Sequence, residues 1–370
     1  MLMKINVSSG IRLLAAVLLG GVVAGCEVVH VLTAQNKPQE VGNVLVHEVV
    51  RTAPPATGTK ARHVILMVGD GMGAEQIGSA WMCNDGKLNL EKLPIIGFSR
   101  TRSASSAITD SAAGGTAIAC GVKTNNGWLG LSPDKKEHLS VMRCLEKAGK
   151  QTGLVVTKAI TDATPASFYA HCSDRSKTSA IADDLVDSGC RVIIGGGTSV
   201  VSPRQMEALK RKGALVRLEG AVHCPPASQR GNFLENAVSE ALTTLEKHPD
   251  GFFLMIEGSQ IDTAGHWMNL RETVQETLDF DRALGVVLRW MQSHPDTLLV
   301  VTADHQTGGL SLLGGAVEKG EVKGSFATMR HSGVAVPVYA AGAGAAAFGG
   351  MQENTELKPK ILRACGLTSE

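Results

Sequence analysis

The stretch VILMVGD, residues 64–70, is a short apolar run that ends on the carboxylate of Asp70. Two later runs have the same form, FFLMI (252–256) before Glu257 and TLLVVTA (297–303) before Asp304. Short runs rich in Val, Ile and Leu are typical of strands buried in a parallel sheet that helices cover on both faces. Ligands of such sheets bind beyond the carboxyl ends of the strands. We therefore expect the three carboxylates to meet along one edge of a sheet.

A metal site is the simplest reason for carboxylates to gather in this way. Clustered carboxylates repel one another unless positive charge lies between them. His305 follows Asp304 directly, and a strand has no ordinary structural use for two adjacent metal-type ligands at its tip. Asp262 and His266 are four residues apart, so on a helical turn they share one face and offer two ligands to one divalent ion. Taken singly, Asp262 is equally a helix cap, and His266 and His331 are equally surface or loop residues.

Strand-like and helix-like segments alternate from about residue 61 to the end of the chain. Further strands are expected at 153–157, 191–196 and 336–342, and helices near 138–149, 176–187, 203–212, 232–247, 271–293 and 355–364. This alternation predicts an α/β fold, a three-layer α/β/α sandwich with a mainly parallel central sheet. One catalytic domain over residues 61–370 is the simplest division. The formal net charge of +1 and the lack of a basic stripe give no indication of nucleic-acid binding.

The N-terminus has the pattern of a targeting segment rather than of a folded element. Lys4 and Arg12 precede the apolar stretch LLAAVLLGGVVAG, which ends at Cys26. The tetrapeptide VAGC resembles the lipobox of bacterial lipoproteins. That resemblance implies that residues 1–25 are a signal peptide and that Cys26 carries a lipid anchor; an ordinary secretory peptide is the alternative.

Residues 26–60 are largely polar and contain several prolines, which is typical of a tether between a membrane and a domain. The expected location is the periplasmic face of a bacterial membrane or the cell surface. Seven cysteines follow Cys26, so at least one thiol has no intramolecular partner in the monomer, and the sequence assigns no pairs.

Ser111, Thr164 and Arg175, which do not belong to the three strand-end carboxylates, point to phosphate chemistry. Ser111 begins a run of small residues typical of a tightly packed helix, with Thr109 or Asp110 as the candidate cap. A serine at a helix N-terminus can contact a bound anion, but it needs a base or a metal to act as a nucleophile, and a plain N-cap serine is the alternative. Thr164, in the segment Asp162-Ala163-Thr164-Pro165, offers oxygen to a hard cation such as Mg²⁺. Arg175 can clamp a phosphate with two N–H bonds, or be a solvated surface residue.

Six segments of the chain together resemble the alkaline phosphatase family, in that family's order over residues 62–345. They are GDGMG (69–73), TDSAAGGTA (109–117), TDATPASFYAH (161–171), EGSQID with a histidine four residues on (257–266), TADH (302–305) and HSG (331–333). Each segment is modest alone, and six in order make coincidence implausible. The resemblance is to a short bacterial form that lacks most of a crown insertion.

The resemblance implies that the chain hydrolyses phosphate monoesters through a phosphoserine intermediate on Ser111, with Arg175 binding the phosphate. It also implies two zinc ions and one magnesium ion. The first zinc would be held by Asp262, His266 and His331, the second by Asp70, Asp304 and His305, and the magnesium by Asp70, Thr164 and Glu257. Asp162 would hold a water bound to the magnesium, and Asp110 would support the substrate site.

The chain departs from the family in length and at two positions. Only residues 306–330 separate the Asp304-His305 pair from His331, where larger relatives carry the crown insertion that shapes the dimer interface. The family's homodimer therefore does not follow directly. Thr263 stands where some relatives carry lysine and others an aromatic residue or histidine, which leaves the choice of third metal open, although Asp162 favours magnesium. Trp267 either covers the first zinc or belongs to the core.

Two alternative functions are compatible with parts of the pattern. A phosphodiesterase of the same superfamily typically uses threonine as its nucleophile, whereas Ser111 and Arg175 favour monoesters. A lipid-anchored protein that binds phosphate or metal without turnover would lack the nucleophile or a zinc ligand, and this chain has the full set.

Overall fold

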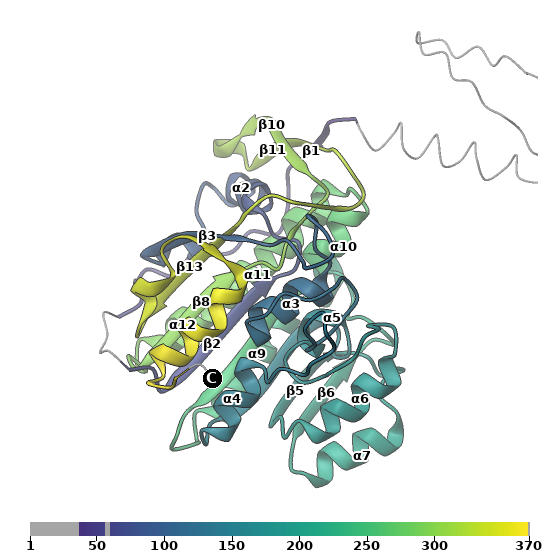
Figure 1. Ribbon diagram of the computed structural model, residues 1–370. Coiled ribbons are helices and arrows are strands. Elements are labelled where there is room, and N and C mark those ends of the chain that lie inside the picture. Colours follow the sequence, from purple (N-terminus) through teal and green to yellow (C-terminus); the bar gives the residue numbers. More distant parts are fainter. Residues whose placement is uncertain (1–36, 56–59, 369–370) are drawn as a thin grey trace, which may run out of the picture.

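The computed structural model of the chain describes residues 37–55 and 60–368. The expected signal peptide and Cys26 lie outside these residues. A nine-stranded sheet forms the centre of the domain, in the order β14–β3–β13–β8–β2–β7–β4–β5–β6 (Figure 1). Its strands are β2 (His63–Gly69), β3 (Ile95–Arg100), β4 (Gln151–Ala159), β5 (Val192–Gly196), β6 (Leu215–Glu219), β7 (Phe252–Gly258), β8 (Thr297–Thr302), β13 (Val336–Gly342) and β14 (Gly350–Glu353).

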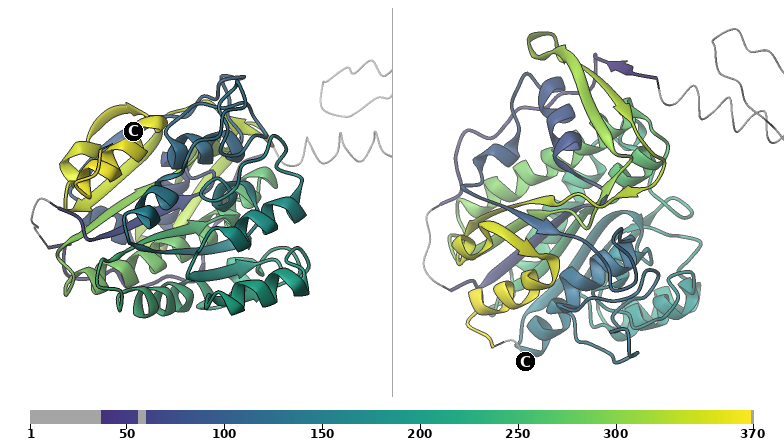
Figure 2. Two further views of the ribbon diagram at one scale, coloured as in Figure 1. Left: turned by 60° about the horizontal axis from the view of Figure 1, so that its bottom comes forward. Right: turned by 45° about the horizontal axis from the view of Figure 1, so that its top comes forward.

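The six strands from β8 to β6 are parallel to one another, and β13 is antiparallel to both of its neighbours, β8 and β3. Helices cover both faces of this sheet (Figure 2). The α/β/α sandwich with a mainly parallel sheet is thus confirmed. The strands expected from the apolar runs are all present, whereas β3, β6 and β14 were not expected.

Side chains of β2 alternate between two hydrophobic cores. Val64, Leu66 and Val68 pack in one core, and Ile65 and Met67 in the other. Each side chain of this strand is fully buried, which explains why the run is apolar at every position rather than at alternate ones. Burial of one such side chain stabilises the fold by roughly 1.5–3 kcal/mol.

The helices divide between the two cores. One core contains residues of α2 (Ala74–Cys83), α9 (Phe233–Leu245) and α11 (Leu270–Met291). The other contains residues of α3 (Ser111–Cys120), α4 (Val141–Lys147), α5 (Ala163–Ala166), α6 (Thr178–Asp187), α7 (Pro203–Arg211) and α12 (Leu357–Ala364). The short helices α8 (Ala227–Arg230) and α10 (Gln260–His266) lie before and after β7 in the chain. Every helix expected from the sequence is present, within a few residues of the expected bounds.

A second, three-stranded sheet is made of β1 (Gln39–Val41), β11 (Glu321–Phe326) and β10 (Leu310–Ala316), all antiparallel. It projects at the top of Figure 1. The segment in which larger relatives carry a crown insertion is therefore a single hairpin here. The two-residue strands β9 (Gln306–Thr307) and β12 (His331–Ser332) pair at the base of this hairpin.

Residues 37–55 lie against the domain, although they belong to the expected tether. Val41 and Val50 are buried, and the Val50 N–H donates to Asn89 Oδ1 at 2.8 Å. His47 Nε2 lies 3.1 Å from Asp281 Oδ2. Within residues 37–55 and 60–368, no helix is long and apolar enough to cross a membrane. All seven cysteines of this part of the chain are free thiols.

Candidate metal centre and active site

The register of the sheet brings the expected carboxylates to one edge. Val68 of β2 lies opposite Glu257 of β7 and Thr302 of β8, and Val156 of β4 lies on the other side of Glu257. Asp70 and Asp304 each come two residues beyond this level in the chain. The prediction that Asp70, Glu257 and Asp304 meet at the carboxyl ends of adjacent strands is borne out by this geometry.

Asp262, His266 and His331 form one group of metal-type ligands. The Nε2 atoms of the two imidazoles lie 3.1 Å apart, and they lie 3.2 and 3.4 Å from Asp262 Oδ1. Ligand atoms around a tetrahedral zinc with bonds of about 2.0–2.1 Å are separated by roughly 3.3 Å. The spacing of this group therefore fits zinc.

The hydrogen bonds of the two imidazoles support the same assignment. His266 Nδ1 faces Met329 O at 2.7 Å, and His331 Nδ1 faces Thr109 O at 2.8 Å. If each carbonyl accepts a hydrogen bond from Nδ1–H, each Nε2 of the neutral rings carries a lone pair. Two lone pairs that face each other at this distance repel, and a metal ion or a proton between them removes the repulsion. The structure thus argues against the view that His266 and His331 are ordinary surface or loop residues.

Asp70, Asp304, His305 and Ser111 meet in a second group. His305 Nε2 lies 3.1 Å from Asp304 Oδ2, 3.6 Å from Asp70 Oδ1 and 3.2 Å from Ser111 Oγ. In a serine hydrolase triad the serine and the carboxylate face opposite nitrogens of the imidazole. Here they face the same nitrogen, which is the arrangement expected of ligands around one ion.

Asp110, rather than Ser111, caps helix α3. Its Oδ1 accepts from the Ala113 N–H at 3.0 Å, so the Ser111 hydroxyl is not used as a cap. Gly114 lets the helix approach β8, because a Cβ atom there would lie 3.0 Å from Asp304 O. The interpretation of Ser111 as a plain N-cap is therefore wrong, and the run of small residues holds the serine beside Asp304.

A third set of oxygen atoms fits magnesium. Asp70 Oδ1, Thr164 Oγ1 and Glu257 Oε2 are buried and make no hydrogen bond within the described part of the chain. Oxygen ligands are those that Mg²⁺ prefers. Burial and neighbouring carboxylates raise the pKa of Asp70 and of Glu257 above their usual values. A bound cation would stabilise the ionised forms of Asp70 and Glu257, which burial and mutual repulsion disfavour.

Arg175 links the N-cap residues of helices α3 and α5, Asp110 and Asp162. Its Nη1 donates to Asp110 Oδ2 at 3.3 Å and its Nη2 to Asp162 Oδ1 at 3.0 Å. Its side chain is one-third exposed, at 33%. Because the guanidinium has five N–H groups, two such bonds leave donors for a phosphate beside Ser111. Arg175 is thus held at the site and is not a solvated surface arginine.

Two residues of the centre were missed by the sequence analysis. The Thr307 hydroxyl lies 3.2 Å from His305 Nδ1 and donates to Asp262 Oδ1 at 2.6 Å, so it links the two ligand groups. Lys158 Nζ lies 2.9 Å from Asp262 Oδ2 and 3.5 Å from Asp70 Oδ2. Lys158 follows the apolar run of β4, so the strand-end reasoning applied to the carboxylates could have found it.

The neighbouring carboxylates keep the side chain of Lys158 protonated. Burial alone would lower the pKa of Lys158, but Asp262, Asp70 and Asp162 together raise it well above its usual value. The same pairing acts on Asp262. Burial would raise the pKa of Asp262, but Lys158 and the imidazoles of His266 and His331 hold it well below its usual range.

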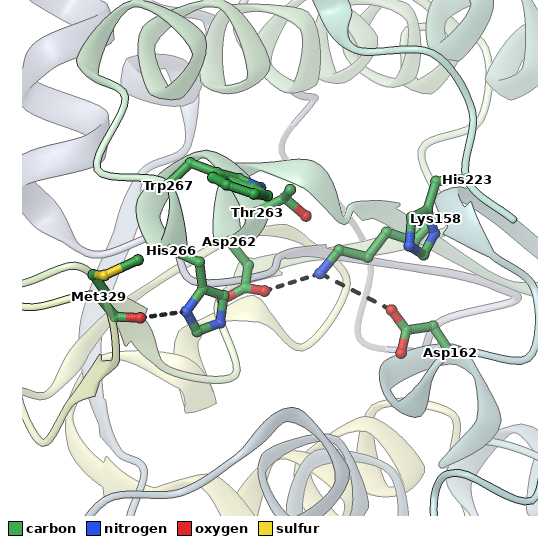
Figure 3. A pocket seen from close by; sticks show the side chains of 8 residues that line it. All are labelled: Lys158, Asp162, His223, Asp262, Thr263, His266, Trp267 and Met329. Atoms are coloured by element: carbon green, nitrogen blue, oxygen red, sulfur yellow. Dashed lines mark hydrogen bonds and ion pairs between the residues drawn. The ribbon is translucent and has the colours of Figure 1, made fainter. Parts of the chain in front are cut away.

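A pocket of about 490 Å³ opens over this centre. Figure 3 shows His266, Asp262, Lys158 and Asp162 in a row across it, with Trp267 on one side. Trp267 is 66% exposed, so it does not belong to the core. Thr263, His223 and Met329 also line the pocket, so Trp267 and Met329 place an exposed aromatic and an apolar side chain beside the first ligand group.

The family model described as alkaline phosphatase matches residues 61–231 and 220–323 of this chain. The chain belongs to the alkaline phosphatase family. It is 33% identical to alkaline phosphatase 3 of Bacillus subtilis (strain 168) over 287 residues, which cover 68% of this chain and 62% of that protein. It is 34% identical to the repressible alkaline phosphatase of Saccharomyces cerevisiae over 322 residues, 68% of this chain and 56% of that protein. The chain thus spans about three-fifths of the length of these curated relatives.

Solved alkaline phosphatases have the same fold. The enzyme from the Antarctic bacterium TAB5 superposes with a TM-score of 0.79 and 34% identity, over 84% of this chain and 99% of that one. A variant of the TAB5 enzyme, in which one histidine is replaced by aspartate, has Mg bound in its M3 site and superposes with a TM-score of 0.78. The family resemblance expected from the six motifs is therefore confirmed.

Proposed function

We propose that this protein hydrolyses phosphate monoesters through a phosphoserine intermediate on Ser111. The observation that carries the proposal is the position of Ser111 Oγ, 3.2 Å from His305 Nε2 and at the N-terminus of α3. A serine in this position has both metal-type ligands and helix N–H groups beside it. Membership of the alkaline phosphatase family supports the same reaction.

The reaction follows from the roles of the chain's own groups. Ser111 Oγ forms a bond to phosphorus as the bond to the ester oxygen breaks. The alcohol leaves with the proton that the serine gives up, and water then cleaves the phosphoserine to release inorganic phosphate. Arg175 and the N–H groups of the first turn of α3 bind the phosphoryl oxygens, while Asp110 and Asp162 hold Arg175 in place.

The proposed metals match the donor atoms of the three sets. Asp262, His266 and His331 would hold one zinc, Asp70, Asp304 and His305 a second, and Asp70, Thr164 and Glu257 a magnesium. Imidazole with carboxylate suits zinc, and an all-oxygen set suits magnesium. When bound, the ions supply electrophilic stabilisation of the attacking and leaving oxygens.

An assay with metal removal and return tests the proposal. We expect the full-length chain, purified in detergent, to hydrolyse p-nitrophenyl phosphate at alkaline pH. Treatment with a chelator should abolish turnover, and zinc with magnesium should restore it. No activity, or activity indifferent to the chelator, would overturn the assignment and favour a binding protein without turnover. Faster hydrolysis of bis-p-nitrophenyl phosphate than of the monoester would instead favour a phosphodiesterase.

We propose in addition that the chain is exported and anchored by a lipid on Cys26. The support is the sequence pattern that ends at VAGC, which lies outside the described residues. Cells that express the chain should incorporate labelled palmitate into it, and Cys26→Ser should abolish the label and release the protein from the membrane fraction. Equal labelling of both proteins would exclude the anchor.

A further inference from the structure

Lys158 carries a buried positive charge inside a cluster of carboxylates. It is 8% exposed and is the eighth residue of β4, beyond the apolar run of that strand. Its Nζ donates to Asp262 Oδ2 at 2.9 Å and lies 3.5 Å from Asp70 Oδ2 and 3.9 Å from Asp162 Oδ2. Figure 3 shows the ammonium between Asp262 and Asp162, at the floor of the pocket.

We propose that Lys158 is a resident cation of the catalytic centre, which balances part of its negative charge and reduces its requirement for magnesium. This inference rests on the proposed function, because it concerns the magnesium of that site. It assigns to a residue of the chain a share of the charge that a third metal ion would otherwise supply.

The balance of charges supports this role. The centre holds five carboxylates, those of Asp70, Asp162, Glu257, Asp262 and Asp304. Two zinc ions would leave one negative charge over, and the Lys158 ammonium neutralises it. Arg175 and its other partner, Asp110, add no further net charge, so the centre is neutral with zinc alone, and the N–H groups that Arg175 does not use remain for the phosphate.

The position of the ammonium explains why magnesium would be weakened rather than excluded. Of the three proposed magnesium ligands, Lys158 contacts Asp70 alone. Thr164 Oγ1 and Glu257 Oε2 make no hydrogen bond with any described residue and stay free for the ion. Magnesium and Lys158 would nevertheless share Asp70 and lie close together, and two like charges at short range oppose each other's binding.

The chain offers a matched control for substitutions at this position. Lys358 on α12 is as buried as Lys158, at 9%, but its Nζ donates to the backbone carbonyls of Cys120 and Leu139. Lys158→Met removes the charge and keeps much of the length, Lys158→Arg keeps the charge, and Lys358→Met removes a buried lysine elsewhere.

Magnesium binding to the zinc-loaded proteins, measured by equilibrium dialysis and elemental analysis, is the main test. We expect Lys158→Met to bind magnesium at least roughly tenfold more tightly than the wild type, with Lys158→Arg and Lys358→Met close to the wild type. The magnesium dependence of turnover should change in parallel: the wild type keeps most of its turnover with zinc alone, and Lys158→Met needs added magnesium. Equal magnesium affinity in wild type and Lys158→Met would overturn the proposal.

Thermal unfolding without metal provides a second readout. In the metal-free protein Lys158→Met should unfold at a lower temperature than the wild type, because Asp70, Asp162 and Asp262 lose the ammonium that they share, and metal should remove most of the difference. Lys358→Met should be destabilised equally with and without metal. If Lys158→Met does not fold, Lys158→Gln provides the same comparison. A wild type without phosphatase activity would contradict the proposed function alone, since magnesium affinities still report on Lys158.

Discussion

Ser111 Oγ and His305 Nε2 lie 3.2 Å apart, and the same imidazole nitrogen also faces the carboxylates of Asp304 and Asp70. Under the proposed function, the serine is one of a set of ligands around one ion, and its reactivity depends on that ion. We expect Ser111→Ala to lower kcat for p-nitrophenyl phosphate by roughly 10⁴-fold or more, the scale on which loss of a nucleophile acts.

Metal analysis is the control for Ser111→Ala. The variant keeps every proposed carboxylate and imidazole ligand, so its zinc content should remain near that of the wild type. Acid quenching of the wild type with labelled substrate should trap label on the protein, and the variant should trap none. Substantial turnover by the variant would show that another group attacks phosphorus.

Arg175 offers a test of phosphate binding that leaves the nucleophile intact. Lysine cannot reproduce the paired N–H bonds of the guanidinium, which here also reach Asp110 and Asp162. We predict that Arg175→Lys raises both KM and the inhibition constant of inorganic phosphate by roughly tenfold, with a smaller effect on kcat. Competitive inhibition by phosphate measures this directly. An unchanged inhibition constant would remove Arg175 from the phosphate site.

Stability away from the catalytic centre depends on a buried ion cluster. Arg230 on α8 donates to Glu276 and Asp279 on α11, and all three side chains are at most 2% exposed. Arg230→Met leaves the buried Glu276 carboxylate without its cationic partner, while Asp279 still pairs with Arg282, so we expect a loss of about 3–5 kcal/mol in the free energy of unfolding. Arg289→Met is the matched control, because Arg289 pairs with Glu235 at 3.4 Å but is 54% exposed, and it should cost less than about 1 kcal/mol. Urea unfolding of the two variants should separate these values clearly.

His63 makes the stability of the fold depend on pH. Its ring is 1% exposed and packs on Phe252 and Trp290, and burial lowers the pKa of His63 from 6.5 to about 4. The unfolded chain binds a proton below pH 6.5, whereas the folded chain does not until about pH 4. Stability is therefore lost as the pH falls through this window.

The prediction is that wild type loses more stability than His63→Leu between pH 6.5 and 4. Both proteins are compared without metal, so that release of zinc in acid does not contribute. Chemical unfolding at several pH values gives the difference in free energy between them. Parallel curves would mean that His63 is protonated equally in the folded and unfolded chains.

The centre of the sheet was predictable because its signal is local. A strand buried on both faces is apolar at every position, so VILMVG, FFLMI and TLLVVTA identify β2, β7 and β8, and their carboxylates mark the edge where they end. No single segment of the sequence predicts the order of these strands in the sheet. The carboxyl ends of parallel strands nevertheless lie at the same edge, whatever their order. The ligand positions followed from this rule and from the family motifs.

Other features were missed because their cause is distant in the sequence. Strand β1 has only three residues, Gln39–Val41, and pairs with β11 more than 280 residues later, as Glu40 opposite Lys323 illustrates. Its pattern is that of a linker, and only its partner makes it a strand. Lys158 and Thr307 were missed for a different reason: the strand-end rule would place Lys158 at the edge of the sheet, but that Lys158 and Thr307 both contact Asp262 appears only in the fold.

Thr307 connects the two ligand groups through hydrogen bonds. His305 Nδ1 donates to its hydroxyl, which donates in turn to Asp262 Oδ1, so one chain of hydrogen bonds runs from the second group into the first. An ion that orients His305 also orients the Thr307 hydroxyl, and so fixes the hydrogen bond that Asp262 Oδ1 accepts. The first group is then arranged for its own ion. Zinc should consequently load this centre cooperatively, and a partly loaded enzyme should be a minor species at every concentration of metal.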